Sequence, residues 1–278
     1  MSNLADFLRL IRLHNLPLVL ASVLVGGWLE SGRFLSSDIL IAALSAALIA
    51  AFGYTHNDYC DQQIDKINKP NRPLPRQGIR PYSALRFSLL LATSGVILSL
   101  MVNYFAPAIA ALAVLLLLLY NRVWKKSFLL GNGVVSILTA GPFIYGGVAV
   151  KKVSLCLVPA LFSFLFHFGR EILKDLEDQQ ADREAKAKTL SVRLGEGAAL
   201  RTATFIYLFL MLSIFIPYIW GLFNQRYLVL AVLGVNLLLL YVLWSVWKDD
   251  SVQNLSRVNS LLKLGMFLGL AAILAGRL

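Results

Sequence analysis

The sequence predicts an all-α membrane protein, a polytopic bundle of about nine transmembrane helices. Hydrophobic residues make up 58% of the 278 residues, and charged residues make up only 15%. A soluble domain usually carries about 25% charged residues. The apolar residues also form long runs, and a helix needs about 20 such residues to cross the core of a bilayer. A transmembrane β-barrel would instead show short segments of alternating polarity.

The apolar runs cover almost the whole chain. The expected spans lie near 14–32, 38–58, 83–104, 106–122, 130–149, 153–174, 198–219, 227–247 and 257–276. Two of the connections between them are long and polar, about 59–82 and 175–197. Because the other connections are short, we expect the chemistry of the protein to lie in these two.

The basic residues predict how the bundle is oriented. All but five of the 26 Lys and Arg residues lie in or beside the amino-terminal segment and the connections after the second, fourth, sixth and eighth spans. Such a bias marks the cytoplasmic side, so we expect the amino terminus inside and the carboxyl terminus outside. The net charge of +11 is then available to anionic lipid headgroups or a phosphorylated substrate. Without a soluble basic domain, nucleic acid is not an expected partner.

Acidic residues gather in two short windows of identical pattern. Eight of the fifteen lie in or just before them, and both windows read D-x-x-D-Q-Q-x-D, at 58–65 and at 175–182. Each window directly follows an apolar span, so we expect both at the same depth on the same side. Solvated helix ends with incidental acids would not repeat one spacing in a chain so poor in acids.

The spacing of these acids points to a metal site. On a helix, positions i, i+3 and i+7 share one face, so each window could aim three carboxylates the same way. Carboxylates so close together repel one another unless a cation intervenes, and Mg²⁺ is typically bound by carboxylates together with substrate phosphates. We therefore predict a paired magnesium–diphosphate site with the ligands Asp58, Asp61, Asp65, Asp175, Asp178 and Asp182.

Basic residues flank both windows. Arg170 and Lys174 precede the second window at i, i+4 spacing, Arg72 follows the first, and Lys125 follows the fourth span. An Arg fork suits phosphate oxygens and Lys supplies a point charge. We expect these four to bind phosphate, the alternative being that they anchor the protein to lipid headgroups.

At this point the residues resemble the UbiA-type intramembrane prenyltransferase family. Its first motif, N-D-x-x-D-x-x-x-D, matches Asn57 to Asp65, and its second, D-x-x-x-D, matches Asp178 and Asp182. The resemblance covers nearly the whole chain and implies one prenyltransferase domain over 1–278. We expect it to consist of two pseudo-repeated halves, about 1–125 and 126–278.

Within the family, the stretches 67–73, 120–132 and 169–178 look most like the branch that makes archaeal-type ether lipids. This implies an Mg²⁺-dependent transfer from geranylgeranyl diphosphate to the hydroxyl of geranylgeranylglyceryl phosphate. Asn57 would bind the metal or a metal-bound water. The remaining substrate-binding residues implied are Tyr120, Arg122 and Lys188.

Several alternatives stay open. An aromatic quinone precursor could replace the lipid acceptor, and His167, where the branch would have Asn, leaves the acceptor undecided. His56, His167, the metal-bound carboxylates or the leaving diphosphate could take the hydroxyl proton. A membrane transporter is a remote alternative, because its acids should line the middle of the spans. The oligomeric state cannot be read from the sequence.

Overall fold

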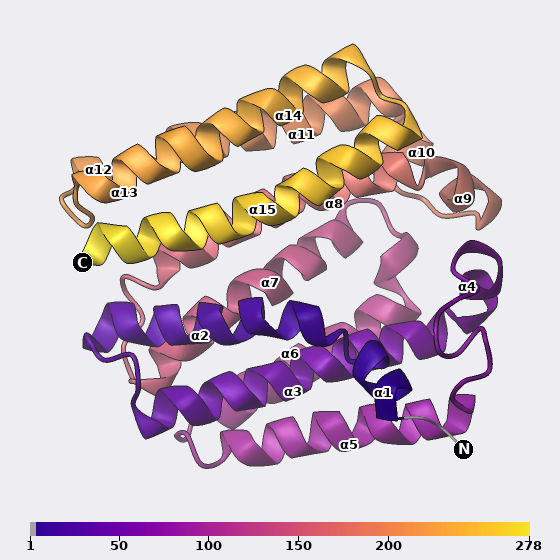
Figure 1. The fold of residues 1–278 in the computed structure, drawn as a ribbon, viewed down its shortest axis with the longest axis horizontal. Coiled ribbons are helices and arrows are strands. Elements are labelled where there is room, and N and C mark those ends of the chain that lie inside the picture. The colour runs from indigo at the N-terminus through magenta and orange to yellow at the C-terminus, as the bar shows by residue number, and fades with distance from the viewer. Residues whose placement is uncertain (1–3) are drawn as a thin grey trace. The chain divides into compact units, whose positions relative to one another are not determined.

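The computed structural model describes residues 4–278, apart from the side chains of residues 67 and 68. Over these residues the chain is helical and forms no strand (Figure 1). It divides into two compact units, one made of the residues up to Val123 with Pro142–Cys156, the other of Trp124–Gly141 with Leu157–Leu278. The division falls inside α7 (Leu130–Ala149), at its internal Pro142.

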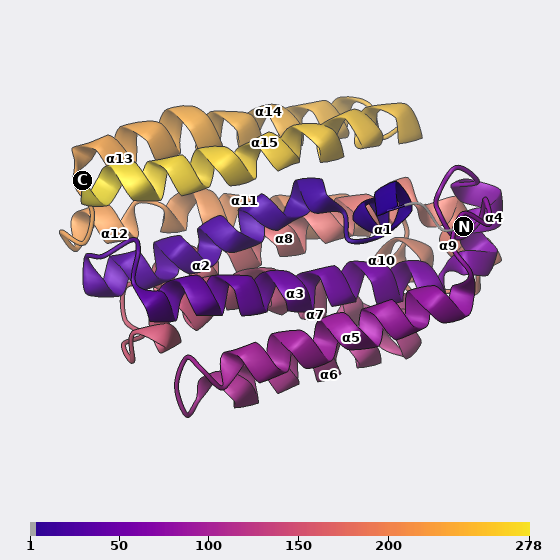
Figure 2. The same cartoon turned by 60° about the horizontal axis from the view of Figure 1, so that its bottom comes forward.

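The first unit is built around one long helix, α3, which packs against α2, α5 and α6. Figure 2 shows α5 running beside α3 and the short α4 following the end of α3. The helices of this unit are α1 (Leu4–Leu10), η1 (Leu13–Asn15), α2 (Leu16–Ser31), α3 (Ser37–Cys60), α4 (Gln62–Asn68), α5 (Pro81–Ser99), α6 (Ala106–Arg122) and the last part of α7.

The second unit is built around α8, which packs against α10, α11 and α15. Its elements are η2 (Trp124–Lys126), the first part of α7, α8 (Leu157–Glu177), α9 (Gln179–Glu184), α10 (Leu190–Leu194), α11 (Glu196–Ser213), α12 (Ile216–Ile219), α13 (Gln225–Leu230), the π-helix η3 (Ala231–Asn236), α14 (Leu237–Lys248) and α15 (Val252–Arg277). The helices α3 and α8 both lead directly into an aspartate window.

Glycines allow α2 to lie against the last part of α7. A Cβ atom at Gly26 would overlap the carbonyl oxygen of Phe143, and one at Gly146 would overlap that of Val23. Helices in membranes commonly approach closely at such small residues. The contact packs α2 closely against the last part of α7 within the first unit.

Among the described residues, seven helices are long and apolar enough to cross a membrane. The apolar α6 is shorter, with 17 residues, and α8 carries the charges of Arg170, Glu171 and Lys174 near its end. The protein is an all-α, multi-pass membrane protein, as the sequence predicts.

Two of the expected spans are interrupted in the structure. The run at 198–219 forms two helices, because α11 ends at Ser213 and α12 starts at Ile216, with Pro217 in its first turn. The run at 227–247 contains η3 between α13 and α14. The short α1 was not among the predicted elements.

Candidate active site

Both aspartate windows have the same backbone conformation. α3 ends at Cys60, Asp61 has φ −88° and ψ 2°, and α4 follows. In the second window α8 ends at Glu177, Asp178 has φ −89° and ψ 6°, and α9 follows. The middle aspartate of each window therefore lies at a break between two helices.

This break corrects the expectation of one regular helix through each window. The i to i−4 backbone bonds nevertheless continue: the amide of Asp65 donates to the carbonyl of Asp61, and that of Asp182 to Asp178, both at 2.9 Å. The helical spacing of the first and third aspartates is thus retained across the break. The break itself turns a short helix, α4 or α9, away from the end of a long one.

Arg72 joins the first and third aspartates of the first window. Its Nη1 atom donates to Asp58 Oδ1 at 3.0 Å and to Asp65 Oδ2 at 2.6 Å. Both carboxylates are buried, with 4% of each residue exposed. Because one nitrogen contacts both oxygens, these two carboxylates lie within reach of a single cation.

A second guanidinium reaches Asp58 from the amino-terminal segment. Arg12 Nη2 donates to Asp58 Oδ1 at 2.7 Å, and its Cζ lies 5.3 Å from the centre of the Tyr54 ring. Arg12 has φ 49° and ψ 56°, a left-handed conformation that costs a residue with a side chain about 1–3 kcal/mol. The contact of this guanidinium with Asp58 therefore comes with a conformational cost in the backbone of Arg12.

The segment before Arg12 is tied to the loop that follows α4. Asp6 of α1 is buried and pairs with Arg76, and Leu10 packs with Leu74 and Ile79. This loop, residues 69–80, also carries Arg72. The amino terminus and the loop thus support the two arginines that contact Asp58.

Asn57 is held from the end of α6. Its Nδ2 atom donates to Asn121 Oδ1 at 2.9 Å, which orients the amide; the amide oxygen is a hard ligand of the kind that Mg²⁺ binds. Asn121 lies between Tyr120 and Arg122. The predicted residues Tyr120 and Arg122 are therefore on the helical turn that contacts Asn57.

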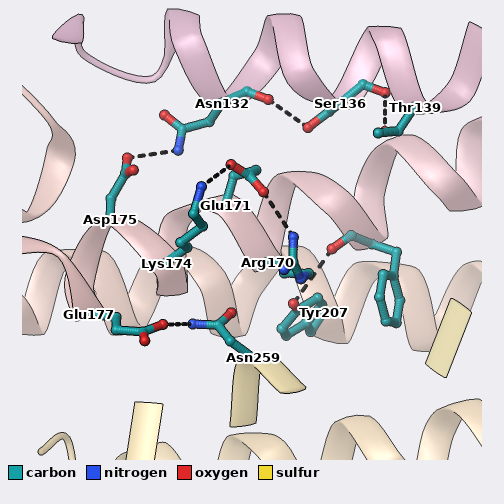
Figure 3. A network of polar contacts seen from close by, with 11 residues as sticks. Asn132, Ser136, Thr139, Arg170, Glu171, Lys174, Asp175, Glu177, Tyr207 and Asn259 are labelled. Carbon is teal, nitrogen blue, oxygen red and sulfur yellow. Dashed lines mark hydrogen bonds and ion pairs between the residues drawn. The ribbon is translucent and has the colours of Figure 1, made fainter. Parts of the chain in front are cut away.

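In the second window, two aspartates accept hydrogen bonds from neighbouring elements. Asn132 of α7 donates to Asp175 Oδ2 at 2.8 Å (Figure 3), and Thr189 Oγ1 donates to Asp182 Oδ2 at 3.1 Å. Asp178 is exposed. The first and third positions are therefore held by partners in both windows.

Burial raises the pKa of Asp182, and the carboxylate of Asp178 adds to the rise. The hydrogen bond from Thr189 and the charges of Lys125 and Lys174 act in the opposite direction. Lys125 is therefore close enough to Asp182 to affect its ionisation. The backbone amide of Lys188 donates to the carbonyl of Lys126 at 2.8 Å, which joins the predicted Lys188 to the segment that carries Lys125.

Arg170 and Lys174 meet at a glutamate. Arg170 Nη1 donates to Glu171 Oε1 at 3.0 Å, and Lys174 Nζ lies 3.6 Å from Glu171 Oε2 (Figure 3). The two predicted phosphate-binding residues are thus held by one carboxylate. This acid lies just before the second window.

The oxygen donors of both windows suit Mg²⁺. No three acidic, His or Cys side chains among residues 4–278 as described form a ready-made cation cluster. Magnesium is usually bound by one or two carboxylates, with water and substrate phosphates completing its shell. The close pair Asp58 and Asp65 meets that requirement, so the donor set fits a metal bound together with a diphosphate.

Four residues at the site were not predicted: Arg12, Asn121, Asn132 and Thr189. Asn121 and Asn132 lie in the stretch 120–132 that carries the family resemblance, and Thr189 directly follows Lys188, which the resemblance implied; this was the available signal. Arg12 had none beyond its positive charge, because its partner is 46 positions away.

The comparison with protein families decides the relationship. The model of the UbiA prenyltransferase family matches residues 19–270. The chain belongs to the UbiA prenyltransferase family. It is therefore a prenyltransferase, as expected from the two aspartate windows.

Other UbiA-family proteins resemble it over their full length. A protein of Methanopyrus kandleri named digeranylgeranylglyceryl phosphate synthase is 36% identical over 98% of this chain and 99% of its own. The protein of that name from Saccharolobus solfataricus is 32% identical over 99% and 98%. The branch indicated by the sequence is the same.

Solved UbiA-family structures share the fold. One, described as giving insights into digeranylgeranylglyceryl phosphate synthase in membranes, has a TM-score of 0.82 and 33% identity and covers 99% of each chain. A UbiA homologue from Archaeoglobus fulgidus bound to DMAPP and Mg²⁺ has a TM-score of 0.70, covering 96% of this chain and 99% of its own. At 17% identity, this second likeness concerns the fold alone.

Proposed function

We propose that the protein transfers a geranylgeranyl group from geranylgeranyl diphosphate to the hydroxyl of geranylgeranylglyceryl phosphate, forming an ether. The observation that carries the proposal is the repeated aspartate window, with one backbone break and one spacing in α3–α4 and α8–α9. The relatives named for this reaction match over almost the whole chain. Both windows would serve one diphosphate.

The carboxylates of both windows, with Asn57, would hold Mg²⁺. The metal, when bound, would neutralise the diphosphate and make it a better leaving group. Arg12, Arg72 and Lys125 lie beside these carboxylates and would bind the diphosphate oxygens not taken by metal. The apolar helices would keep water away from the allylic cation until the acceptor hydroxyl attacks.

The test is to supply the purified protein with labelled geranylgeranyl diphosphate and each acceptor class in turn. We expect product with the phosphorylated lipid acceptor and none with a hydroxybenzoate-type quinone precursor. Product only with the aromatic acceptor would replace this proposal by ring prenylation. Absence of any magnesium-dependent diphosphate release would contradict both.

We also propose that the site faces the cytoplasm, with the amino terminus inside. The distribution of basic residues supports this orientation. Cys60 in the first window is exposed and Cys156 is buried, so a membrane-impermeant thiol reagent reports the side of Cys60. We expect labelling in inverted vesicles and not in right-side-out ones, with a Cys60→Ser variant as control; the reverse pattern would overturn the orientation.

A further inference from the structure

Glu171 is a buried carboxylate that the proposed reaction does not use. Only 7% of the residue is exposed, and it lies on α8 one turn before Asp175. Each of its two oxygens faces a different cation, Arg170 on one side and Lys174 on the other (Figure 3). A buried carboxylate is costly unless it is paired, so the two bases offset the cost of burying this acid.

The geometry goes beyond ordinary helix pairing. Residues at i and i+3 are neighbours on a helix surface, but adjacent residues do not face each other. Lys174 therefore meets Glu171 by its position, whereas the Arg170 side chain has to fold toward it. That side chain is 15% exposed, and its Nε atom is buried with no hydrogen-bond partner among the described residues.

The backbone beneath Arg170 is fixed as well. The ring of Tyr207, which is fully buried, packs on Gly169, where an added Cβ would lie 2.5 Å from the ring. The backbone next to Arg170 is thus packed against Tyr207, and the guanidinium of Arg170 contacts Glu171. The three side chains together carry one negative and two positive charges, and the carboxylate is the group that both cations share.

Lys174 supplies the accessible end of this group. Its side chain is 45% exposed, and its Nζ lies 3.6 Å from the carboxylate, beyond the usual 2.7–3.2 Å hydrogen-bond distance. An ammonium group has three donors, so its contact with Glu171 does not occupy all of them. A half-exposed cation, oriented by a buried acid, suits a phosphate oxygen.

We propose that Glu171 is a positioning residue, which holds Arg170 and Lys174 as a pair for the phosphate monoester of the lipid acceptor. The proposal rests on the proposed function. It adds which residues bind the phosphate of the acceptor. Under the proposed function, the aspartate windows hold the Mg²⁺ that neutralises the diphosphate of the donor. The monoester needs cations of its own, and this pair lies on α8 just before the second window.

The test compares two acceptors, geranylgeranylglyceryl phosphate and geranylgeranylglycerol, in the wild type and Glu171→Gln. The amide is of similar size but can no longer hold two cations. We expect the KM for the phosphorylated acceptor to rise at least about tenfold, equivalent to about 1.4 kcal/mol. We expect kcat and the KM for the donor to change less than about threefold.

Comparing the two acceptors in the two proteins makes a double-difference cycle. It isolates the coupling between Glu171 and the phosphate of the acceptor. Wild type should bind the acceptor without phosphate weakly, and Glu171→Gln should weaken that binding no further. An unchanged KM for the phosphorylated acceptor, or an equal rise for both acceptors, would overturn the proposal. Failure of the wild type to use either acceptor would instead contradict the proposed function, so the two outcomes are distinct.

Two more variants guard against misfolding. Glu177→Gln removes a second acid of α8, which accepts from Asn259 at 2.6 Å (Figure 3), and should leave both acceptor constants unchanged. Glu171→Asp keeps the charge on a shorter arm, so we expect a KM between wild type and Glu171→Gln. If Glu171→Gln does not insert into membranes, the test uses Glu171→Asp and Lys174→Met instead. A wild-type KM for the phosphorylated acceptor in both of these variants would contradict the proposal.

Discussion

Arg12 donates a 2.7 Å hydrogen bond to Asp58, 46 positions further along the chain. It does so from a left-handed backbone conformation, φ 49°, at the point where α1 gives way to η1 and α2. Strain of this kind persists where the surrounding structure fixes it and is frequent at functional sites. The amino-terminal segment is therefore part of the candidate site.

Replacing Arg12 by Ala should raise the KM for the prenyl diphosphate about tenfold and lower the melting temperature. A hydrogen bond to a charged group contributes about 1.5–3 kcal/mol, and Asp58 would keep its contact with Arg72. Arg12→Gly should melt at a higher temperature than Arg12→Ala, because glycine adopts positive φ readily. Arg9→Ala is the control, because the Arg9 side chain is 62% exposed. A donor KM as low as that of the control would contradict a role in the site.

Replacing Arg72 by Ala should reduce kcat/KM for the donor at least about a hundredfold and also destabilise the protein. It takes a cationic partner away from the buried Asp65 and another away from the buried Asp58; a buried charge that loses its partner is strongly destabilising. Arg72→Lys should not restore wild-type kinetics, since an ammonium does not reproduce the planar fork of a guanidinium. The matched control is the exposed Arg80, on the same loop. Equal kinetics for Arg72→Ala and Arg80→Ala would exclude the assignment.

Much of this site could be predicted because its signals are local. The spacing of Asp58, Asp61 and Asp65 and its copy at Asp175 to Asp182 can be read within eight residues. The breaks at Asp61 and Asp178 could not, since both windows keep helical spacing and contain no Gly or Pro. Their recurrence with nearly the same φ and ψ is a property of the folded chain.

The partners of the aspartates were beyond sequence reasoning for a different reason. The contacts of Arg12 with Asp58 and of Asn132 with Asp175 join positions 46 and 43 apart, and no periodicity links them. The pairing of Arg170 and Lys174 through Glu171 is the opposite case. Their spacing on one helix was visible, but the fold of the Arg170 side chain toward its neighbour was not.

The metal requirement should depend on pH through Asp182. Its pKa is raised by burial, so as pH falls through that raised value the carboxylate takes up a proton, which Mg²⁺ has to displace. The Mg²⁺ concentration for half-maximal activity should therefore rise as the pH is lowered.

Thr189→Val provides the direct check. This variant lacks the Thr189 hydroxyl, whose hydrogen bond lowers the pKa of Asp182. The pKa of Asp182 should therefore rise further. The increase in Mg²⁺ requirement should then begin at a higher pH than in the wild type. Titrations of activity with Mg²⁺ at a series of pH values measure this. Thr202→Val is the control, since the Thr202 hydroxyl donates to the backbone carbonyl of Ala198 in its own helix. Superimposable profiles for Thr189→Val and the wild type would exclude Asp182 as the titrating ligand.

We propose that both aspartate windows act on one magnesium–diphosphate. The most direct measurement is transfer from labelled geranylgeranyl diphosphate in detergent by Asp61→Asn, Asp178→Asn and the double variant, with membrane insertion checked for each. The account predicts that each single variant loses at least about two orders of magnitude in turnover, and that the double loses little more, because residues acting as one unit are not additive. Near-normal turnover in both single variants would contradict it.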